Sequence, residues 1–526
     1  MRIRAGMPEA RCIAVAWAAL LASGPVCADP AAAAQDAARS YVARHEHDIL
    51  REFMTLLAIP NLASDSASIR RNAEHIVGLL KQRGVAARLL EVKGSPPAVH
   101  GELRAPGTGF TLMIYAHYDG QPVTESDWVS PPWQPVLRDG RVEDGAKDLL
   151  AASLDGPLDP DWRVYARSAG DDKAPIVAVL RALDALAAAG IPRAVNLEFF
   201  FEGEEEAGSP HLGAMLDRHA DALGADLWLF CDGPRHQSGR PQLAFGVRGV
   251  AGMDLTVFGP ARALHSGHYG NWAPNPAAML AHLLAGMRAA DGRILIEGVD
   301  DAVRPPTAAE LAAVAAAPPV DAQLRQEFEL GHNEGGDTRL ELLLLEPALN
   351  VKGLRAGAVG DAAPNAIPVS ATAALGFRLV PDLTPAKLRE LVEAHVRAQG
   401  YRVVREPPDA PARRAHARIA QLDWHDSGYP AVRTDMGSPP ARALIDLMQR
   451  VAGDDLVLMP TMGGSLPLYL IAERLGAPVV ILPIANHDNN QHAANENLRL
   501  GNLFQAVATY AALFAGLAPA AVQPGD

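Results

Sequence analysis

Histidine and carboxylate side chains follow directly after short apolar runs at several places in this chain. The residues in such positions are His117, Asp119, Glu205, Glu206 and Asp232. Two more candidates are Asp171, which opens a helical pattern, and His492, which follows the last apolar run. Imidazole and carboxylate groups are ligands that suit zinc and neighbouring divalent metals. Two such metals about 3.5–4 Å apart share a water and a bridging carboxylate and polarise a carbonyl group. These residue types therefore indicate metal-assisted hydrolysis.

Some of these motifs also have an interpretation without a metal. His117 and Asp119 are two residues apart after a strand, so both face one side, and Asp119 would hold the second ring nitrogen of a metal-ligating His117. The alternative is a histidine that caps a strand beside a turn aspartate. Asp171 or Asp172 would instead be the N-cap of the next helix, since aspartate is a preferred cap, or one would cap while the other bridges metals.

The run 202–206 holds four glutamates within five residues. Without cations their charges would repel one another, whereas one carboxylate on a metal beside one that carries a proton suits hydrolysis. A solvated acidic loop is the alternative. On spacing alone, His487 is the alternative to His492 as a metal ligand. Cys231 is interpreted as buried packing, because no paired base is identifiable that would make its thiolate a nucleophile.

The elements that must position these residues alternate between strands and helices. This alternation predicts an α/β fold, with a mostly parallel sheet and helices on both faces. The predicted strands are 87–92, 99–103, 111–117, 195–201, 226–231 and 478–483. The predicted helices are 37–57, 66–83, 174–189, 438–451, 466–475 and 500–517. The candidate ligands at carboxyl ends of strands stand where open α/β sheets form ligand sites.

The pattern changes in the middle of the chain. There the predicted strands are 250–258, 370–379, 401–404 and 417–424, and the predicted helices are 276–289 and 384–398. We interpret this part as an inserted α+β domain. The Ala- and Pro-rich stretch 308–320 is expected to be a surface linker or the edge of a helix. The expected organisation is a catalytic domain in two parts, 29–245 and 433–526, around an inserted domain, 246–432.

Residues 1–28 have the layout of a secretory signal peptide. Three arginines precede an apolar run at 12–22, and a small-residue site follows at Val26–Ala28. Cleavage after Ala28 predicts an exported protein, periplasmic or secreted; a lipidated Cys27 is the alternative. Only Cys231 of the three cysteines would remain, which excludes an intrachain disulfide. The net charge of -14 over 526 residues argues against nucleic acid or an anionic membrane as the partner.

Taken in order, these motifs resemble the M20 metallopeptidases, a family that includes carnosinase-like dipeptidases, glutamate carboxypeptidase and amino-acid deacylases. The motifs that carry the resemblance are His117-x-Asp119, Gly170-Asp171-Asp172-Lys173, Glu205-Glu206-Ala207-Gly208-Ser209, Asp232 and His492-x-x-Asn495-Glu496.

The resemblance implies two divalent metal ions, with zinc favoured over manganese or cobalt. His117 and Asp232 would hold one metal, Glu206 and His492 the other, and Asp171 would bridge the two. Glu205 would be the general base, and Asp119 would be the partner of His117. The family pattern also implies a cis peptide bond between Asp171 and Asp172.

The inserted domain resembles the family's lid. His265 resembles a lid histidine that stabilises the oxyanion, commonly from the partner subunit, so a homodimer is implied. Arg378 resembles the arginine that grips a substrate carboxylate, and Asn365 would add a polar contact. Gly464 and Ser465 resemble the loop that binds the same carboxylate ahead of a helix, whose dipole would favour an anion.

The implied function is hydrolysis of peptide bonds in dipeptides or short peptides with a free C-terminus. An aspartate at position 232 resembles the dipeptidase and aminopeptidase members. An N-acyl amino acid deacylase is the alternative, because the same machinery cleaves both kinds of amide. A non-catalytic periplasmic binding protein would not need Glu205 beside a full ligand set, and a relative that kept the fold without activity is the third possibility. Residues 293–356 and 486–490 depart from the family pattern and are candidates to line the substrate side.

Overall fold

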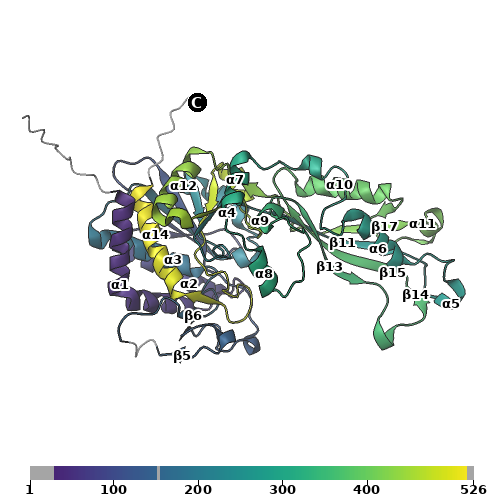
Figure 1. Ribbon diagram of the computed structural model, residues 1–526, viewed down its shortest axis with the longest axis horizontal. Helices are drawn as coiled ribbons and strands as arrows, with labels where there is room; N and C mark the ends of the chain where they lie inside the picture. The colour runs from purple at the N-terminus through teal and green to yellow at the C-terminus, as the bar shows by residue number, and fades with distance from the viewer. Residues whose placement is uncertain (1–28, 151–154, 518–526) are drawn as a thin grey trace, which may run out of the picture.

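The apolar runs form an eight-stranded sheet in one half of the molecule (Figure 1). The computed structural model describes residues 29–150 and 155–517. In sheet order the strands are β1 (Ala86–Leu90), β2 (Ala98–Leu103), β7 (Asn196–Glu202), β3 (Thr111–His117), β8 (Leu227–Phe230), β20 (Val479–Ile481), β9 (Gln242–Ala244) and β19 (Val457–Met459). The central neighbours β7, β3, β8 and β20 run parallel, whereas β1 and β2 add an antiparallel edge. The predicted mostly parallel sheet is confirmed.

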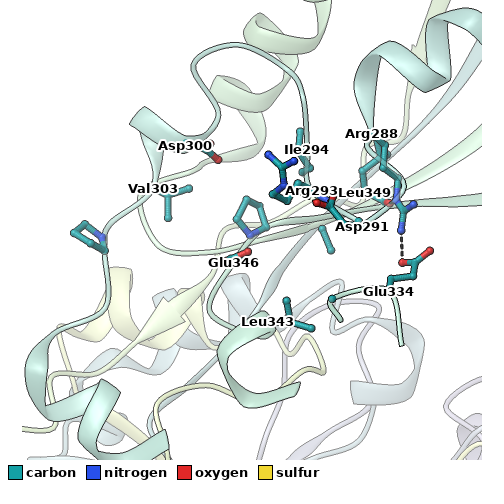
Figure 2. A pocket seen from close by; sticks show the side chains of 15 residues that line it. Arg288, Asp291, Arg293, Ile294, Asp300, Val303, Glu334, Leu343, Glu346 and Leu349 are labelled. Carbon is teal, nitrogen blue, oxygen red and sulfur yellow. Dashed lines mark hydrogen bonds and ion pairs between the residues drawn. The ribbon is translucent and has the colours of Figure 1, made fainter. Parts of the chain in front are cut away.

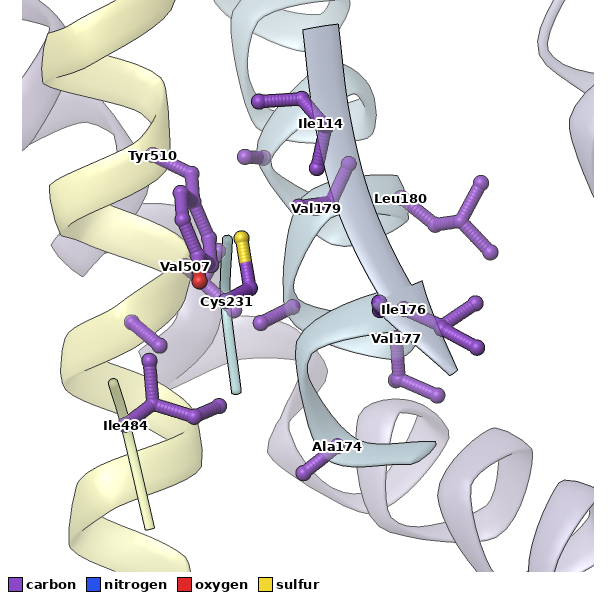
Figure 3. Close-up of a cluster of buried hydrophobic side chains, with 14 of the residues drawn as sticks. Ile114, Ala174, Ile176, Val177, Val179, Leu180, Cys231, Ile484, Val507 and Tyr510 are labelled. Carbon is purple, nitrogen blue, oxygen red and sulfur yellow. The ribbon is translucent and has the colours of Figure 1, made fainter. Parts of the chain in front are cut away.

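Helices cover both faces of this sheet. One face packs against α1 (Pro30–Leu57), α2 (Ser66–Gln82), α3 (Lys173–Ala189), α12 (Pro439–Ala452) and α14 (Leu500–Gly516), the other against α4 (Leu212–Leu223) and α13 (Tyr469–Leu475). Alternate residues of β3 serve the two cores, since Ile114 enters the first and Tyr115 the second. Figure 3 shows the first core, where Cys231 lies among apolar side chains beside Tyr510. Burial raises the pKa of the Cys231 thiol, which agrees with its interpretation as packing.

The lid is the second half of the molecule (Figure 1). Its sheet has the order β13 (Ala348–Arg355), β15 (Ser370–Leu379), β11 (Gly249–Phe258), β17 (Ile419–Trp424) and β16 (Arg402–Val404). Every second residue of β11 from Ala251 to Val257 is buried in a core with α6 (Pro276–Met287) and α10 (Pro385–Ala398). These helices therefore cover one face of the lid sheet, and the intervening residues of β11 belong to the opposite face.

The chain enters and leaves the lid side by side. Strand β10 (Gly246–Val247) pairs antiparallel with β18 (Val432–Arg433). A Cβ on Gly246 would lie 2.0 Å from the carbonyl oxygen of Val432, so only glycine allows this close approach. The inserted lid is confirmed as part of the fold, while the residue boundaries of the domains stay predictions.

Several elements differ from the sequence prediction. Helix α1 begins at Pro30 instead of residue 37, because Asp29 caps it and proline suits the first helical position. The stretch 308–320, expected to be a surface linker or the edge of a helix, contains the complete helix α7 (Ala308–Ala316), which begins with a capping box between Thr307 and Glu310. An unpredicted four-stranded sheet consists of β21 (Asn497–Arg499), β6 (Arg163–Tyr165), β4 (Val136–Arg138) and β5 (Asp148–Leu149).

The remaining elements are short. They are β12 (Leu264–His265), α5 (Ser266–Tyr269) and β14 (Ala366–Ile367) at the far end of the lid, α8 (Asp321–Glu327) and α9 (Leu340–Leu343) between the two halves, and α11 (Ala410–Ala415). Within the two described ranges, no helix combines the length and apolar character that a membrane span requires. The predicted signal peptide lies outside the described residues.

Candidate metal centre

The carboxyl ends of three neighbouring strands meet at one edge of the large sheet. In the register of β3 and β7, His117 stands opposite Glu202, and in that of β3 and β8, Tyr115 stands opposite Phe230. Glu205 and Glu206 therefore follow β7, and Asp232 follows β8, close to the strand end that carries His117. The sequence prediction that these side chains meet at one sheet edge is confirmed.

Two groups of side chains have the composition and spacing of metal sites. Their members are His117, Asp172 and Asp232 in the first group, and Asp171, Glu206 and His492 in the second. Within each group the ligand atoms lie within 4.8 Å of one another. The structure thus brings together every residue predicted as a metal ligand, and it adds Asp172.

Asp171 lies between the two histidines. Its Oδ1 is 2.8 Å from His117 Nε2, and its Oδ2 is 3.1 Å from His492 Nε2. His492 Nε2 is also 3.3 Å from Glu206 Oε2. A carboxylate with one oxygen toward each group has the arrangement of a bridging ligand. The rival His487 is 3.8 Å from Glu327 and belongs to neither group.

The N-cap interpretation of the two aspartates is wrong. Helix α3 begins at Lys173, and Asp172 occupies the cap position, but its side chain makes no capping hydrogen bond. Instead, its Oδ2 accepts a hydrogen bond from the backbone N–H of His117 at 3.3 Å. The peptide bond between Asp171 and Asp172 is cis, as the family resemblance implies. Both aspartates contact His117 at the end of β3.

Asp119 connects the first histidine with the glutamates. It is fully buried, and its Oδ1 lies 3.3 Å from His117 Nδ1. The same carboxylate accepts hydrogen bonds from the backbone N–H groups of Glu205, at 3.1 Å, and of Glu206, at 3.0 Å. Asp119 therefore orients the imidazole and also fixes the backbone that carries both glutamates. The second of these contacts was not foreseen from the sequence.

Only two of the four clustered glutamates face the candidate metal centre. Glu202 ends β7 and accepts a hydrogen bond from the Tyr115 hydroxyl at 2.7 Å. Glu204 accepts from the backbone N–H of His211 at 2.8 Å and lies 2.9 Å from the His211 ring. The expectation that all four would need cations is therefore too broad, because Glu202 and Glu204 have partners of their own. Glu205 Oε2 lies 3.9 Å from His117 Nε2.

Glu496 holds the loop that presents Asp171. It is fully buried, and its two oxygens accept four hydrogen bonds of 2.8–2.9 Å. The donors are Arg167 Nη1 and the backbone N–H groups of Ser168, Gly170 and Asp171. The sequence motif contains Glu496, but its position gave no indication of this partner loop.

Two glutamine amides also touch the candidate ligands. Gln121 Nε2 donates to Glu206 Oε2 at 2.7 Å, and Gln491 Nε2 donates to Asp171 Oδ2 at 2.5 Å. Sequence reasoning missed both glutamines, because an isolated glutamine in a loop has no distinguishing spacing.

The electrostatics of the cluster fit divalent cations. Within the described residues, no lysine or arginine nitrogen lies within 4.0 Å of a carboxylate oxygen of Asp171, Asp172, Asp232, Glu205 or Glu206. Burial, followed by the charge of Asp171, raises the pKa of Asp232 to about 7 and that of Glu206 to about 8. Buried carboxylates gathered around two imidazoles without a basic side chain need positive charge, which divalent metals supply.

The predicted substrate residues fall into two places. Arg378 Nη1 donates to Ser465 Oγ at 2.5 Å, so the lid arginine reaches the loop that carries Gly464. His265 and Asn365 lie instead near α5 and β14, at the end of the lid farthest from the large sheet (Figure 1). Within one chain these two residues are not near the candidate metal centre.

The glycine loop does not lead straight into a helix. The helix predicted from residue 466 begins at Tyr469, after the segment Leu466–Leu468. The helix that follows the glycine loop therefore begins three residues later than predicted. The polar groups of the loop and the nearby arginine are what this region offers to an anion.

Tyr429 is a further residue near the site. Its ring stacks on Tyr469, with 5.6 Å between centroids. Burial, followed by the negative charge of Glu205, raises the pKa of its phenol to about 12. Tyr429 thus lies close to Glu205 and stays protonated at neutral pH.

Comparison with known proteins places these features in one family. The sequence pattern of peptidase family M20/M25/M40 matches residues 113–515. A Cys-Gly metallodipeptidase of Saccharomyces cerevisiae is 27% identical over 429 residues, which cover 79% of this chain and 81% of the relative. The human Beta-Ala-His dipeptidase is 25% identical over 446 residues, covering 80% and 78%. The crystal structure of an M20 family metallo-carboxypeptidase from Sulfolobus solfataricus superposes with a TM-score of 0.67 at 27% identity, covering 89% of this chain and 98% of that one.

Proposed function

The chain belongs to peptidase family M20/M25/M40, and we propose that it is a two-metal dipeptidase that cleaves dipeptides or short peptides with a free C-terminus. The observation that carries this proposal is the position of Asp171 between His117 and His492, with Glu205 beside them. Two relatives, a Cys-Gly metallodipeptidase and a Beta-Ala-His dipeptidase, support the dipeptide substrate.

The side chains present would hold two divalent metal ions, with zinc as the first choice. His117 and Asp232 would hold one ion, Glu206 and His492 the other, and Asp171 would bridge them. Asp172, in the first group, is a further candidate ligand. When bound, such a pair polarises the scissile carbonyl and lowers the pKa of water between the ions.

Glu205 is the proton carrier in this proposal. Its side chain is largely removed from water, which raises the pKa of the carboxyl group and favours a group that both accepts and releases a proton. It takes a proton from the attacking water and delivers it to the leaving amine. Asp119 keeps Glu205 in place by accepting a hydrogen bond from the backbone N–H of Glu205.

The free C-terminus of the substrate would bind at the junction between lid and catalytic domain. Arg378 and Ser465 meet there, and a guanidinium fork suits a carboxylate. An N-acyl amino acid presents the same carboxylate, so this contact supports a deacylase equally. The two activities differ in the group on the other side of the amide.

The test is hydrolysis of a panel of dipeptides and N-acyl amino acids by the metal-loaded protein. We expect dipeptide cleavage, and a loss of about 10²–10⁴-fold in kcat for Glu205→Gln with its metal content unchanged. Cleavage of the acyl amino acids alone would assign the protein to the deacylases. Full activity of Glu205→Gln would refute its role as the base.

We also propose that the active form is a homodimer, exported from the cytoplasm. His265 is exposed at the far end of the lid, beside the exposed Tyr269 and Trp272. Aromatic residues are enriched at protein interfaces, and a lid histidine that serves catalysis must come from a second copy if it cannot reach its own site.

Mixing two inactive variants tests this dimer. His265→Ala and Glu205→Gln would each be inactive alone, but a mixed dimer contains one site with both an intact Glu205 and an intact His265. Random exchange of subunits would restore about one quarter of the wild-type sites. Absence of recovery in a mixture that demonstrably exchanges subunits would refute a contribution of His265 from the partner.

A further inference from the structure

Arg248 is a buried arginine at the entrance to the lid, just before β11. Only 7% of its surface is exposed. Its backbone N–H donates to the carbonyl oxygen of Gly464 at 3.2 Å, and its Nη2 donates to the carbonyl oxygen of Glu346 at 2.8 Å. Arg248 therefore touches the same glycine loop to which Arg378 reaches.

No acidic side chain neutralises Arg248. Among the described residues, no carboxylate oxygen lies within 4.0 Å of its guanidinium or of that of Arg378, and its Nε is buried without a hydrogen-bond partner. Burial, followed by the positive charge of Arg378, lowers the pKa of Arg248 to about 10. A buried cation beside another cation is costly unless an anion joins them.

The nearby arginines differ from this pair. Glu346 also lines a cavity of about 420 Å³, together with Arg288 and Arg293 (Figure 2). The two arginines that line this cavity already have acidic partners, since Arg288 pairs with Glu334 and Arg293 pairs with Asp291. The missing counter-ion is thus a feature of Arg248 and Arg378 rather than of this region in general.

The lid sheet places Arg378 on its uncovered face, and Arg248 lies just before the first residue of the same sheet's strand β11. Arg378 stands opposite Val250 in the register of β11 and β15, and Tyr429 bridges Val250 on the other side. These positions belong to the sheet face that α6 and α10 leave uncovered, because Ala251 and Phe377 next to them enter the helix-covered core. Arg248 directly precedes β11, and its backbone N–H meets Gly464, the neighbour of the Ser465 that Arg378 contacts.

A single carboxylate balances only one of these two charges. The C-terminal carboxylate of a dipeptide neutralises Arg378, which leaves the charge of Arg248. We propose that Arg248 binds an acidic side chain on the C-terminal residue of the substrate, so that dipeptides ending in glutamate or aspartate are preferred. This inference rests on the proposed peptidase function and specifies its substrate class.

The first test needs no variant. Matched dipeptides that differ only in the C-terminal residue, glutamate against glutamine and aspartate against asparagine, are compared by kcat/KM. A charge-assisted hydrogen bond to a buried guanidinium predicts a preference of about ten- to hundredfold for at least one acidic member. Equal values for both pairs would overturn the inference while leaving the peptidase function intact. Lack of cleavage of every dipeptide would instead refute the function.

Variants then assign the preference to Arg248. Arg248→Met should reduce the ratio of the glutamate to the glutamine substrate to about one, whereas Arg248→Lys should keep part of it. Arg235→Met is the matched control, because Arg235 is also 7% exposed and without an acidic partner, but its Nη1 donates to Gln505. The ratio is insensitive to a general loss of folded protein. A preference that survives in Arg248→Met, or that disappears equally in Arg235→Met, would overturn the assignment.

Discussion

Replacement of Glu496 by glutamine tests whether the loop behind the metal centre determines metal binding. Glu496 accepts hydrogen bonds from Gly170 and Asp171 on one oxygen and from Arg167 and Ser168 on the other. Glutamine has nearly the same shape, but one of its oxygens becomes an NH₂ group. Two of the four donors would then face another donor, and the Arg167 charge would lose its partner.

The magnitude follows from the burial of this pair. The side chains of Arg167 and Glu496 are 2% and 0% exposed, so water does not replace the lost contacts. Removing one partner of a buried ion pair costs roughly 3–5 kcal/mol in the free energy of unfolding. Because Asp171 is the bridging candidate, its displaced backbone should also weaken metal binding by about 10–100-fold.

Two measurements on the Glu496→Gln protein check these values. Urea unfolding gives the loss of stability, and calorimetric zinc titration of the chelated protein gives the affinity. Glu202→Gln is the matched control, because Glu202 is also buried but accepts from Tyr115, and burial raises its pKa to about 7. At pH 6 the Glu202 carboxyl is already largely protonated, so its replacement should cost less than about 1 kcal/mol.

The outcome that would refute this reasoning is specific. If Glu496→Gln binds zinc as tightly as the wild type, the hydrogen bonds to the Gly170–Asp171 backbone do not position the ligand. If both variants lose the same free energy of unfolding, the loss comes from replacing a buried carboxylate in general and not from the four hydrogen-bond donors around Glu496.

Three further predictions concern pH, metal removal and Asp119. Glu202 binds more protons in the folded than in the unfolded chain between its usual pKa of 4.5 and about 7, so its contribution to the free energy of unfolding falls as pH rises through this window. Glu202→Gln should lack this decrease, so its free energy of unfolding relative to wild type should be higher at pH 8 than at pH 5 in denaturation experiments. The same relative value at both pH values would contradict this prediction. Chelation should lower the thermal midpoint, and zinc at 100-fold above its Kd should restore about 2.7 kcal/mol, whereas identical melting with and without zinc would argue against a structural contribution. Asp119→Asn should lower metal affinity or kcat by about 10–100-fold, because one N–H of Glu205 or Glu206 would face an amide nitrogen; wild-type values for both would refute its positioning role.

The sequence by itself determined the parts of the site that depend on local periodicity. A buried strand that ends in a histidine, as at Thr111–His117, places that histidine at the edge of a sheet whatever the rest of the chain does. The same holds for Glu205 and Asp232, because parallel strands bring their carboxyl ends to one edge. The order of the motifs added the family, and with it the predicted set of ligands, which the structure brings together.

Local pattern failed where two local interpretations were equally good. Aspartate before a helix is a normal cap, yet Asp172 turns to the backbone of His117, across 55 residues of sequence. Spacing did not separate His487 from His492, because only the packing of the last loop against Asp171 distinguishes them. Alanine-rich starts and ends of helices were also placed wrongly, since caps such as Asp29 act through single hydrogen bonds.

Only the tertiary structure decided which distant groups support the site. Glu496 holds a loop more than three hundred residues earlier in the chain, and none of the residues that the structure describes offers Arg248 an acidic partner. Hydrogen bonds and unpaired charges depend on distances of a few ångströms between segments, and these distances are set by how sheet, helices and lid pack together. Periodicity specifies which face of an element is buried, whereas packing specifies what that face meets.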